Sequence, residues 1–236
     1  MNKLDLSQQL RSNPYPGRGI VLGRSADGKF AVAAYFIMGR SENSRNRVFT
    51  VTEDGIRTEA HDPSKMTDPS LIIYHPVRQV GDKLIVTNGD QTDTIYDGLQ
   101  AGMSFSQALA QRQFEPDAPN LTPRISGMIT FGDGDFSYQM SILKSADAEG
   151  SACCRYTFDY PALPGLGHFI HTYVTDGNPI PTFQGEPERV AIPDSIDAFT
   201  ETVWNNLDEN NKISLYVRYT DLATGEIAER LINKNK

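Results

Sequence analysis

Short turn signals separate apolar runs along much of the chain, and this pattern constrains the fold more than any other feature. Asp27-Gly28, Asp54-Gly55 and Gly81-Asp82 each stand between two segments rich in β-branched and aromatic residues. Dipeptides of this kind favour the tight turns that join neighbouring antiparallel strands. The same arrangement recurs near the C-terminus around Ala223-Thr224-Gly225. The sequence therefore predicts antiparallel sheets built from consecutive hairpins.

Few segments have helical periodicity. The clearest is 194–207, where Asp194 is a candidate N-cap and the apolar residues recur on one helical face: Ile196, Phe199, Val203 and Leu207. Shorter helices are expected at 104–113, which begins with a serine cap, and around 4–10. These helices and a second sheet are the available covers for broad apolar strand layers.

The 236 residues are enough for one large domain. Segment 161–193 is rich in proline and glycine, yet residues 169–174 inside it have the composition of a strand. We therefore expect a single α+β domain over 1–236, with a loop-rich insertion at 161–193.

Charge and composition exclude several functional classes. The formal net charge of −8 argues against broad binding to nucleic acid or to a membrane surface. There is neither a long apolar run nor the apolar core of a signal peptide, so a cytoplasmic protein is expected. The two cysteines, Cys153 and Cys154, are adjacent, which predicts no disulfide framework.

An arginine-rich segment follows the apolar run 30–38. Arg40, Arg45 and Arg47 fall within eight residues of an otherwise acidic chain. The planar guanidinium group matches phosphate and carboxylate groups, so Arg40, assisted by Arg45 or Arg47, is predicted to bind an anionic small molecule. The alternative is a solvated loop whose arginines pair with surface carboxylates.

A second polar segment begins where the apolar run 84–86 ends. Asn88, Thr92 and Asp93 offer amide, hydroxyl and carboxylate groups suited to reading a base or a ribose. Functional loops concentrate at the ends of strands. The alternative is that Asn88-Gly89 forms only a type I′ turn.

Two further segments offer groups for acid–base chemistry. Glu115 and Arg124 belong to a proline-stiffened junction between an expected helix and a central strand, so the carboxylate is a candidate general base. Tyr74, at the end of an apolar run, is a candidate donor to a developing oxyanion. The alternatives are a rigid connector and a core tyrosine.

Metal and phosphate-loop motifs are missing from the sequence. No His-Glu-x-x-His pattern, zinc-spaced cysteine pair, Walker loop or Gly-x-Ser-x-Gly elbow occurs. His168 and His171 lie three apart and would face opposite sides of a strand. The prediction is accordingly no protein-bound metal.

Taken in order, several short pieces of the first half resemble the archaeal-type IMP cyclohydrolase family. The resemblance covers roughly residues 15–130, and beyond them only Thr172-Tyr173 is similar. The matching pieces are Tyr15-Pro16-Gly17-Arg18, Ala33-Ala34-Tyr35, Arg40-Ser41, Asn46-Arg47, Asp68-Pro69, Tyr74, Val80-Gly81-Asp82, Thr87 to Asp93, Glu115 and Thr122-Pro123-Arg124-Ile125.

The resemblance implies a fold and an activity. The fold is a four-layer αββα sandwich of two mainly antiparallel sheets, like that of N-terminal-nucleophile hydrolases. The activity is the ring closure of 5-formamidoimidazole-4-carboxamide ribotide (FAICAR) to IMP, which needs no cofactor or metal. The expected partners are purine ribotides (FAICAR, IMP and the unformylated AICAR), with homo-oligomerisation possible in addition.

The resemblance also implies roles for the residues above. Arg40 and Arg47 would bind the phosphate, although the loop here is longer than the family's Ser-Phe-Pro-Asn-Arg run, which leaves the choice between them open. Glu115 would be the base, and Tyr74 or Arg124 would protonate the formyl oxygen. The remaining side chains would orient the imidazole carboxamide or the ribose: Asn88, Thr92 and Asp93.

Two other functions stay open from the sequence. One is an amide hydrolase of the same architecture, which would need a nucleophile at a new N-terminus, since Asn2 offers none. The other is a ribotide-binding protein without turnover. A purely structural interpretation, in which all four polar segments are ordinary loops, predicts no ribotide binding.

Overall fold

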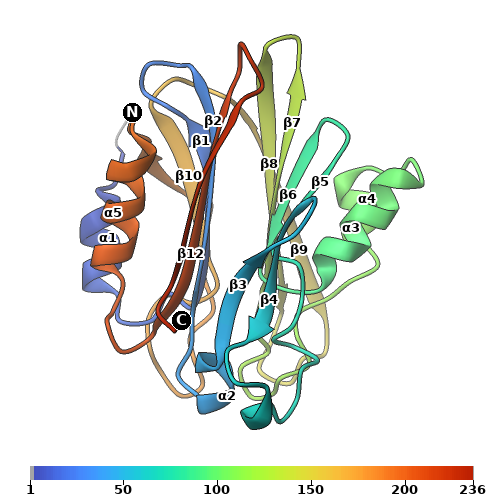
Figure 1. The fold of residues 1–236 in the computed structure, drawn as a ribbon. Coiled ribbons are helices and arrows are strands. Elements are labelled where there is room, and N and C mark those ends of the chain that lie inside the picture. The colour runs from blue at the N-terminus through green and yellow to red at the C-terminus, as the bar shows by residue number, and fades with distance from the viewer. Residues whose placement is uncertain (1–2, 236) are drawn as a thin grey trace.

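The computed structural model describes residues 3–235, and two antiparallel sheets stacked face to face form its centre (Figure 1). Helices cover the outer face of each sheet. Helices α1 (Leu6–Ser12) and α5 (Ile196–Asn206) lie against one sheet, and α3 (Gln91–Gln100) and α4 (Phe105–Leu109) against the other. The predicted four-layer αββα sandwich of the α+β class is confirmed.

The first sheet has six strands in the order β11-β10-β1-β2-β12-β13. Every neighbouring pair in it is antiparallel. The strands are β1 (Arg18–Arg24), β2 (Phe30–Met38), β10 (Leu166–His171), β11 (Glu188–Ala191), β12 (Lys212–Asp221) and β13 (Ile227–Asn233). The proline-rich segment 161–193 thus contributes two strands, one of which pairs with β1.

The second sheet has seven antiparallel strands in sequence order. They are β3 (Arg47–Val51), β4 (Gly55–Ala60), β5 (Val77–Val80), β6 (Lys83–Thr87), β7 (Arg124–Gly132), β8 (Asp135–Ser145) and β9 (Cys153–Pro161). A short helix, α2 (Glu42–Arg45), connects the two sheets, and a 3₁₀ turn (Pro63–Lys65) follows β4.

Three apolar cores correspond to the three interfaces between layers. The core between the sheets includes Ile20, Leu22 and Val86, and a second core joins the six-stranded sheet to α1 and α5. A smaller one, with Ile85 and Met128, lies under α3 and α4. Because side chains alternate along a strand, residues 84 and 86 of β6 face the central core and residue 85 faces the helices.

The two ends of the sandwich differ in their connections. Tight hairpin turns gather at one end, among them 25–29 and 132–135 (Figure 1). At the other, β2, β6 and β10 finish while β1, β3 and β7 begin, and longer segments join them. We call this the connection end. Long connections on a rigid scaffold are where functional groups usually lie.

Several predicted boundaries are wrong. The apolar segment before the Gly81-Asp82 turn, 71–80, is expected to be one strand, but β5 begins only at Val77, although Tyr74 still exchanges hydrogen bonds with Thr58 of β4. The helix expected at 104–113 ends at Leu109. Helix α5 is capped by Ser195, because the Asp194 carboxylate instead accepts a hydrogen bond from the Asp27 N–H.

Helix α3 was not predicted. It begins with polar residues, and its buried positions include Gln91, Thr92 and Gly98 beside Ile95. This leaves too few apolar residues to create a helical period. None of the helices among residues 3–235 is both long enough and apolar enough to cross a membrane.

Candidate active site

Two buried groups of opposite charge, Arg18 and Glu115, form the centre of a polar cluster at the connection end. Arg18 begins β1 on the strand face that carries Ile20 and Leu22, so its side chain lies between the sheets. Glu115 lies between α4 and β7, and only 2% of its surface is exposed. The charges of Arg18 and Glu115 attract each other across the cluster.

Arg47, the first residue of β3, is fully buried beside them. Its Nε donates to the Ser44 carbonyl at 2.8 Å, but Nη1 and Nη2 have no hydrogen-bond partner among residues 3–235. Arg18 Nε and Glu115 Oε1 are likewise unpartnered within that range. Burying unpaired charged groups costs several kcal/mol, roughly, so these atoms indicate a site that an anionic, hydrogen-bonding ligand would complete.

Four tyrosines surround these charges. The hydroxyls of Tyr35 and Tyr74 are 2.8 Å apart, and that of Tyr173 is 2.6 Å from Thr122 Oγ1. The ring of Tyr15 stacks on Tyr173 with centroids 5.7 Å apart. Burial raises the pKa of Tyr173 to about 12 and also raises the pKa of Tyr35, so both act as neutral hydroxyls at physiological pH.

Glu115 has the properties of a general base. Burial raises the pKa of its carboxyl to about 7, against the opposing attraction of Arg18 and Arg124. A carboxyl that titrates near neutral pH can both accept and return a proton under physiological conditions. A surface carboxylate, with its lower pKa, is a weaker base.

The same shift predicts a pH dependence of stability. The folded pKa of about 7 lies above the usual 4.5, so the folded state keeps a proton that the unfolded state has lost. This stabilisation is complete below about pH 4.5 and is lost as the pH rises through about 7. Relative to Glu115→Gln, the free energy of unfolding should fall by about 3 kcal/mol over that range, as urea titrations would measure. Parallel pH curves for the two proteins would contradict this.

Arg124 acts on Glu115 through its charge, and Asn88 holds the segment from which Arg124 comes. Arg124 donates to Gln91 Oε1 at 2.7 Å and pairs with Asp90 at 2.7 Å. The Asn88 side chain accepts from the N–H of Ile125 and donates to the Pro123 carbonyl, both at 2.9 Å. Asn88 therefore fixes the start of β7, which carries Arg124.

Other predicted residues lie further from the buried charges. Thr92 Oγ1 is 2.6 Å from Thr87 Oγ1 and packs the first turn of α3. The Asp93 carboxylate accepts from Arg78 at 2.9 Å, so the structure does not bring it to Glu115. Arg40 lies at the rim, half-exposed, where it pairs with Asp176 at 2.5 Å and stacks on Tyr15.

Sequence reasoning missed four members of the cluster: Arg18, Tyr15, Tyr35 and Tyr173. Each belongs to a piece that carries the family resemblance, namely the Tyr15-Pro16-Gly17-Arg18 opening, the Ala33-Ala34-Tyr35 run and the Thr172-Tyr173 pair. That shared membership was the available signal. Strand parity then explains why Arg18 and Tyr35 face inward, since they share faces with Ile20 and Ile37.

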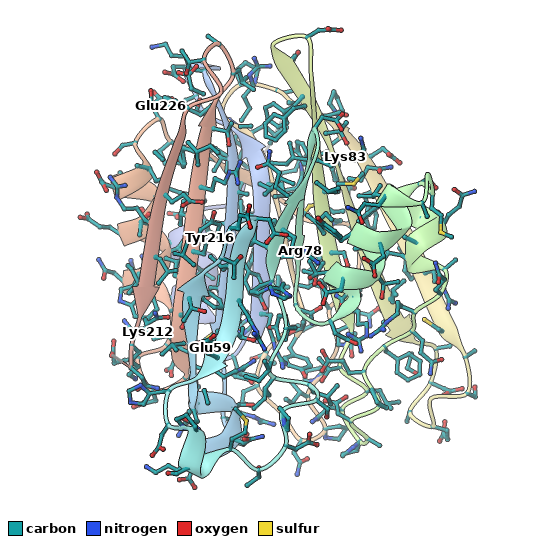
Figure 2. The ribbon with its side chains drawn as sticks, turned by 45° about the vertical axis from the view of Figure 1, so that its right-hand side comes forward. Glu59, Arg78, Lys83, Lys212, Tyr216 and Glu226 are labelled. Carbon is teal, nitrogen blue, oxygen red and sulfur yellow. The ribbon has the colours of Figure 1, made fainter. Side chains whose placement is uncertain are left out.

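A cavity of about 860 Å³ lies elsewhere, at the edge where β5 and β12 approach each other. Figure 2 looks toward this edge and labels Arg78 and Tyr216. Arg78 is paired with Asp54 and Asp93 and stacks on Tyr96, so its charge is already matched. Within residues 3–235, no group of three or more His, Cys, Asp or Glu side chains is arranged to hold a metal ion.

Comparison with known proteins identifies the family of the chain. A family model described as IMP cyclohydrolase-like protein matches residues 15–226. The chain belongs to the IMP cyclohydrolase-like family. An IMP cyclohydrolase of Methanopyrus kandleri is 30% identical over 183 residues, covering 72% of this chain and 89% of that protein. An IMP cyclohydrolase of Methanococcus aeolicus is 34% identical over 163 residues, covering 67% of this chain and 74% of that protein.

Membership of the IMP cyclohydrolase-like family extends past the half of the chain in which the resemblance was seen. The matched residues 15–226 include β10, β11, α5 and β12, as well as Tyr173. The family match therefore covers every residue of the buried cluster described above, from Tyr15 to Tyr173.

Proposed function

We propose that this protein is an IMP cyclohydrolase, which closes the pyrimidine ring of FAICAR and releases water to give IMP. Membership of the family and the names of the relatives support this activity. One observation at the site carries it: unpaired guanidinium nitrogens of Arg47 and a carboxyl of near-neutral pKa, Glu115, are buried in one cluster. The Arg47 nitrogens suit a phosphate, and the Glu115 carboxyl suits proton transfer.

Arg47 is the proposed phosphate ligand, with Arg18 beside it. Its two free terminal nitrogens present the planar fork that binds phosphate oxygens in pairs. Burial lowers the pKa of Arg47, and an arriving dianion would offset that penalty. Arg40 is held by Asp176 at the rim, where it can guide the ribotide inward.

Ring closure joins two arms of one molecule. The carboxamide nitrogen attacks the formyl carbon, and holding the arms in contact supplies much of the acceleration. Glu115 takes the carboxamide proton as the N–C bond forms. The bond between the formyl carbon and its oxygen then breaks, and the oxygen leaves as water. The two protons of this water come from the carboxamide nitrogen and from the formamido nitrogen. Arg124 stabilises the ionised form of Glu115 from behind.

Tyr74 is the proposed donor to the formyl oxygen. Its hydroxyl already shares a hydrogen bond with Tyr35 at 2.8 Å, so one proton lies between two buried oxygens. Tyr35 can keep Tyr74 oriented while Tyr74 donates to the oxyanion that forms on the substrate. Asn88 acts indirectly, by fixing the start of β7, and Thr92 does so by packing α3.

Incubation of the pure protein with FAICAR tests the activity. In metal-free buffer, the rate of IMP formation, followed by absorbance, should be well above the spontaneous rate. Tight binding of AICAR or IMP without turnover would instead favour a binding protein. A mass shortened at the N-terminus, with a new nucleophile exposed, would favour an amide hydrolase. The proposed activity fits the cytoplasmic location expected from the sequence.

A further inference from the structure

Three arginines from three segments line a cleft of about 340 Å³ on the helix side of the seven-stranded sheet. Leu143 of β8 is the register partner of Arg124 on β7 and of Arg155 on β9. The side chains of Arg124, Leu143 and Arg155 therefore form one row across one face of the sheet. Leu143 belongs to the core under α3 and α4, which fixes the face. Arg112, after α4, approaches this row from the helix layer.

The cleft carries more positive charge than its carboxylates balance. Asp90 pairs with both Arg112, at 2.5 Å, and Arg124, at 2.7 Å. Arg155 has no carboxylate partner within residues 3–235; its guanidinium donates to the carbonyls of Arg112, at 2.8 Å, and Cys153, at 3.2 Å. Three cations are therefore balanced by Asp90 and, through Arg124 alone, by the Glu115 carboxyl behind the cleft, in a chain of net charge −8.

Arg124 gives a second, independent indication. Only 5% of its surface is exposed, and its Nε has no hydrogen-bond partner among the described residues. Two backbone carbonyls orient the exposed Arg155 side chain without neutralising its charge, which lowers the side-chain entropy lost when an anion arrives. A preorganised set of guanidinium forks is the arrangement that phosphate oxygens favour.

We propose that this arginine cleft binds a phosphate group, at a position separate from Arg47, and that its occupation tunes ring closure through Arg124. The binding stands apart from the proposed function, whereas the tuning rests on it. Phe114 and Pro116 line the cleft and flank Glu115, so the two sites share a wall. An anion beside Arg124 would weaken the attraction that this guanidinium exerts on the Glu115 carboxylate.

Calorimetric titration with inorganic phosphate and with ribose 5-phosphate tests the binding, without and with saturating IMP to occupy the Arg47 site. Arg155→Ala should weaken the IMP-resistant binding roughly tenfold or more, since one charged donor is removed. Arg57→Ala, an exposed arginine of β4, is the matched control and should bind normally. Equal affinities for inorganic phosphate and ribose 5-phosphate would identify free phosphate as the ligand. Tighter binding of ribose 5-phosphate would identify a phosphorylated metabolite as the ligand.

Tuning has its own readout. Saturating phosphate should move the pH midpoint of kcat/KM upward in the unsubstituted protein and leave it in place in Arg155→Ala. Without phosphate, the two proteins should have equal activity. The proposal is overturned if neither ligand binds, or if all binding is displaced by IMP and unchanged in Arg155→Ala. Failure of ring closure alone would leave the binding result intact, so the two proposals are distinguishable.

Discussion

Replacing Arg47 with methionine is expected to weaken ribotide binding by roughly a hundredfold or more without destabilising the fold. Two charged hydrogen bonds to the phosphate would be lost, each contributing about 1.5–3 kcal/mol. In the free protein the same nitrogens have no partner among residues 3–235, so their removal relieves a desolvation penalty. The free energy of unfolding should stay constant or rise by about 1–4 kcal/mol, as for other buried ions replaced by apolar residues.

The dissociation constant for IMP and the urea midpoint measure these two effects. Arg45→Met is the matched control, because Arg45 lies in the same segment but donates to Gly39 and Asn211 on the outside. Its ribotide affinity should be unchanged. A structural role for Arg47 predicts the reverse pattern, in which Arg47→Met loses several kcal/mol of stability while retaining its affinity.

Replacing Glu115 with glutamine is expected to lower kcat by roughly 10²–10⁴ while ribotide binding changes only a few-fold. Proton transfer by a positioned side chain contributes an acceleration of about that size. Glutamine keeps the shape and removes only the basic oxygen. Glu149→Gln, at an exposed carboxylate, is the control and should turn over normally. Unchanged turnover in Glu115→Gln would remove Glu115 as the base.

A pH profile separates loss of the base from general damage. Only the ionised carboxylate can accept the proton, so kcat/KM should rise with pH and level off above the Glu115 pKa of about 7. The residual activity of Glu115→Gln should lack this rise. A midpoint near 4.5 would mean that the substrate-free site is more solvated than its burial indicates.

The architecture was largely predictable because its determinants are local. Turn signals such as Asp27-Gly28 and Asp54-Gly55 fix hairpins between adjacent segments, and the apolar runs on either side become paired strands. The helix around Phe199 was predicted for the same reason, since its apolar residues recur in the local sequence. Helix α3 was not predicted because it buries polar residues, which do not create an apolar period in the sequence.

The site was predictable only in part. Glu115 and Tyr74, which the sequence suggested as base and donor, are both buried at the connection end, and their roles remain predictions. Which arginine faces inward could not be read from the segment 40–47. Arg40 and Arg47 have the same chemistry and similar neighbours, and only the start of β3 at Arg47 turns one of them into the space between the sheets.

The sequence by itself determined the antiparallel strands, the hairpins and the residue types of the proposed ribotide site, because turn preference and strand alternation act over a few neighbouring residues. The tertiary structure alone decided which of those residues meet. Arg18, Arg47, Tyr74 and Glu115 come from separate parts of the chain and are brought together by sheet stacking. Their charge, hydration and pKa values therefore depend on burial that no local pattern encodes.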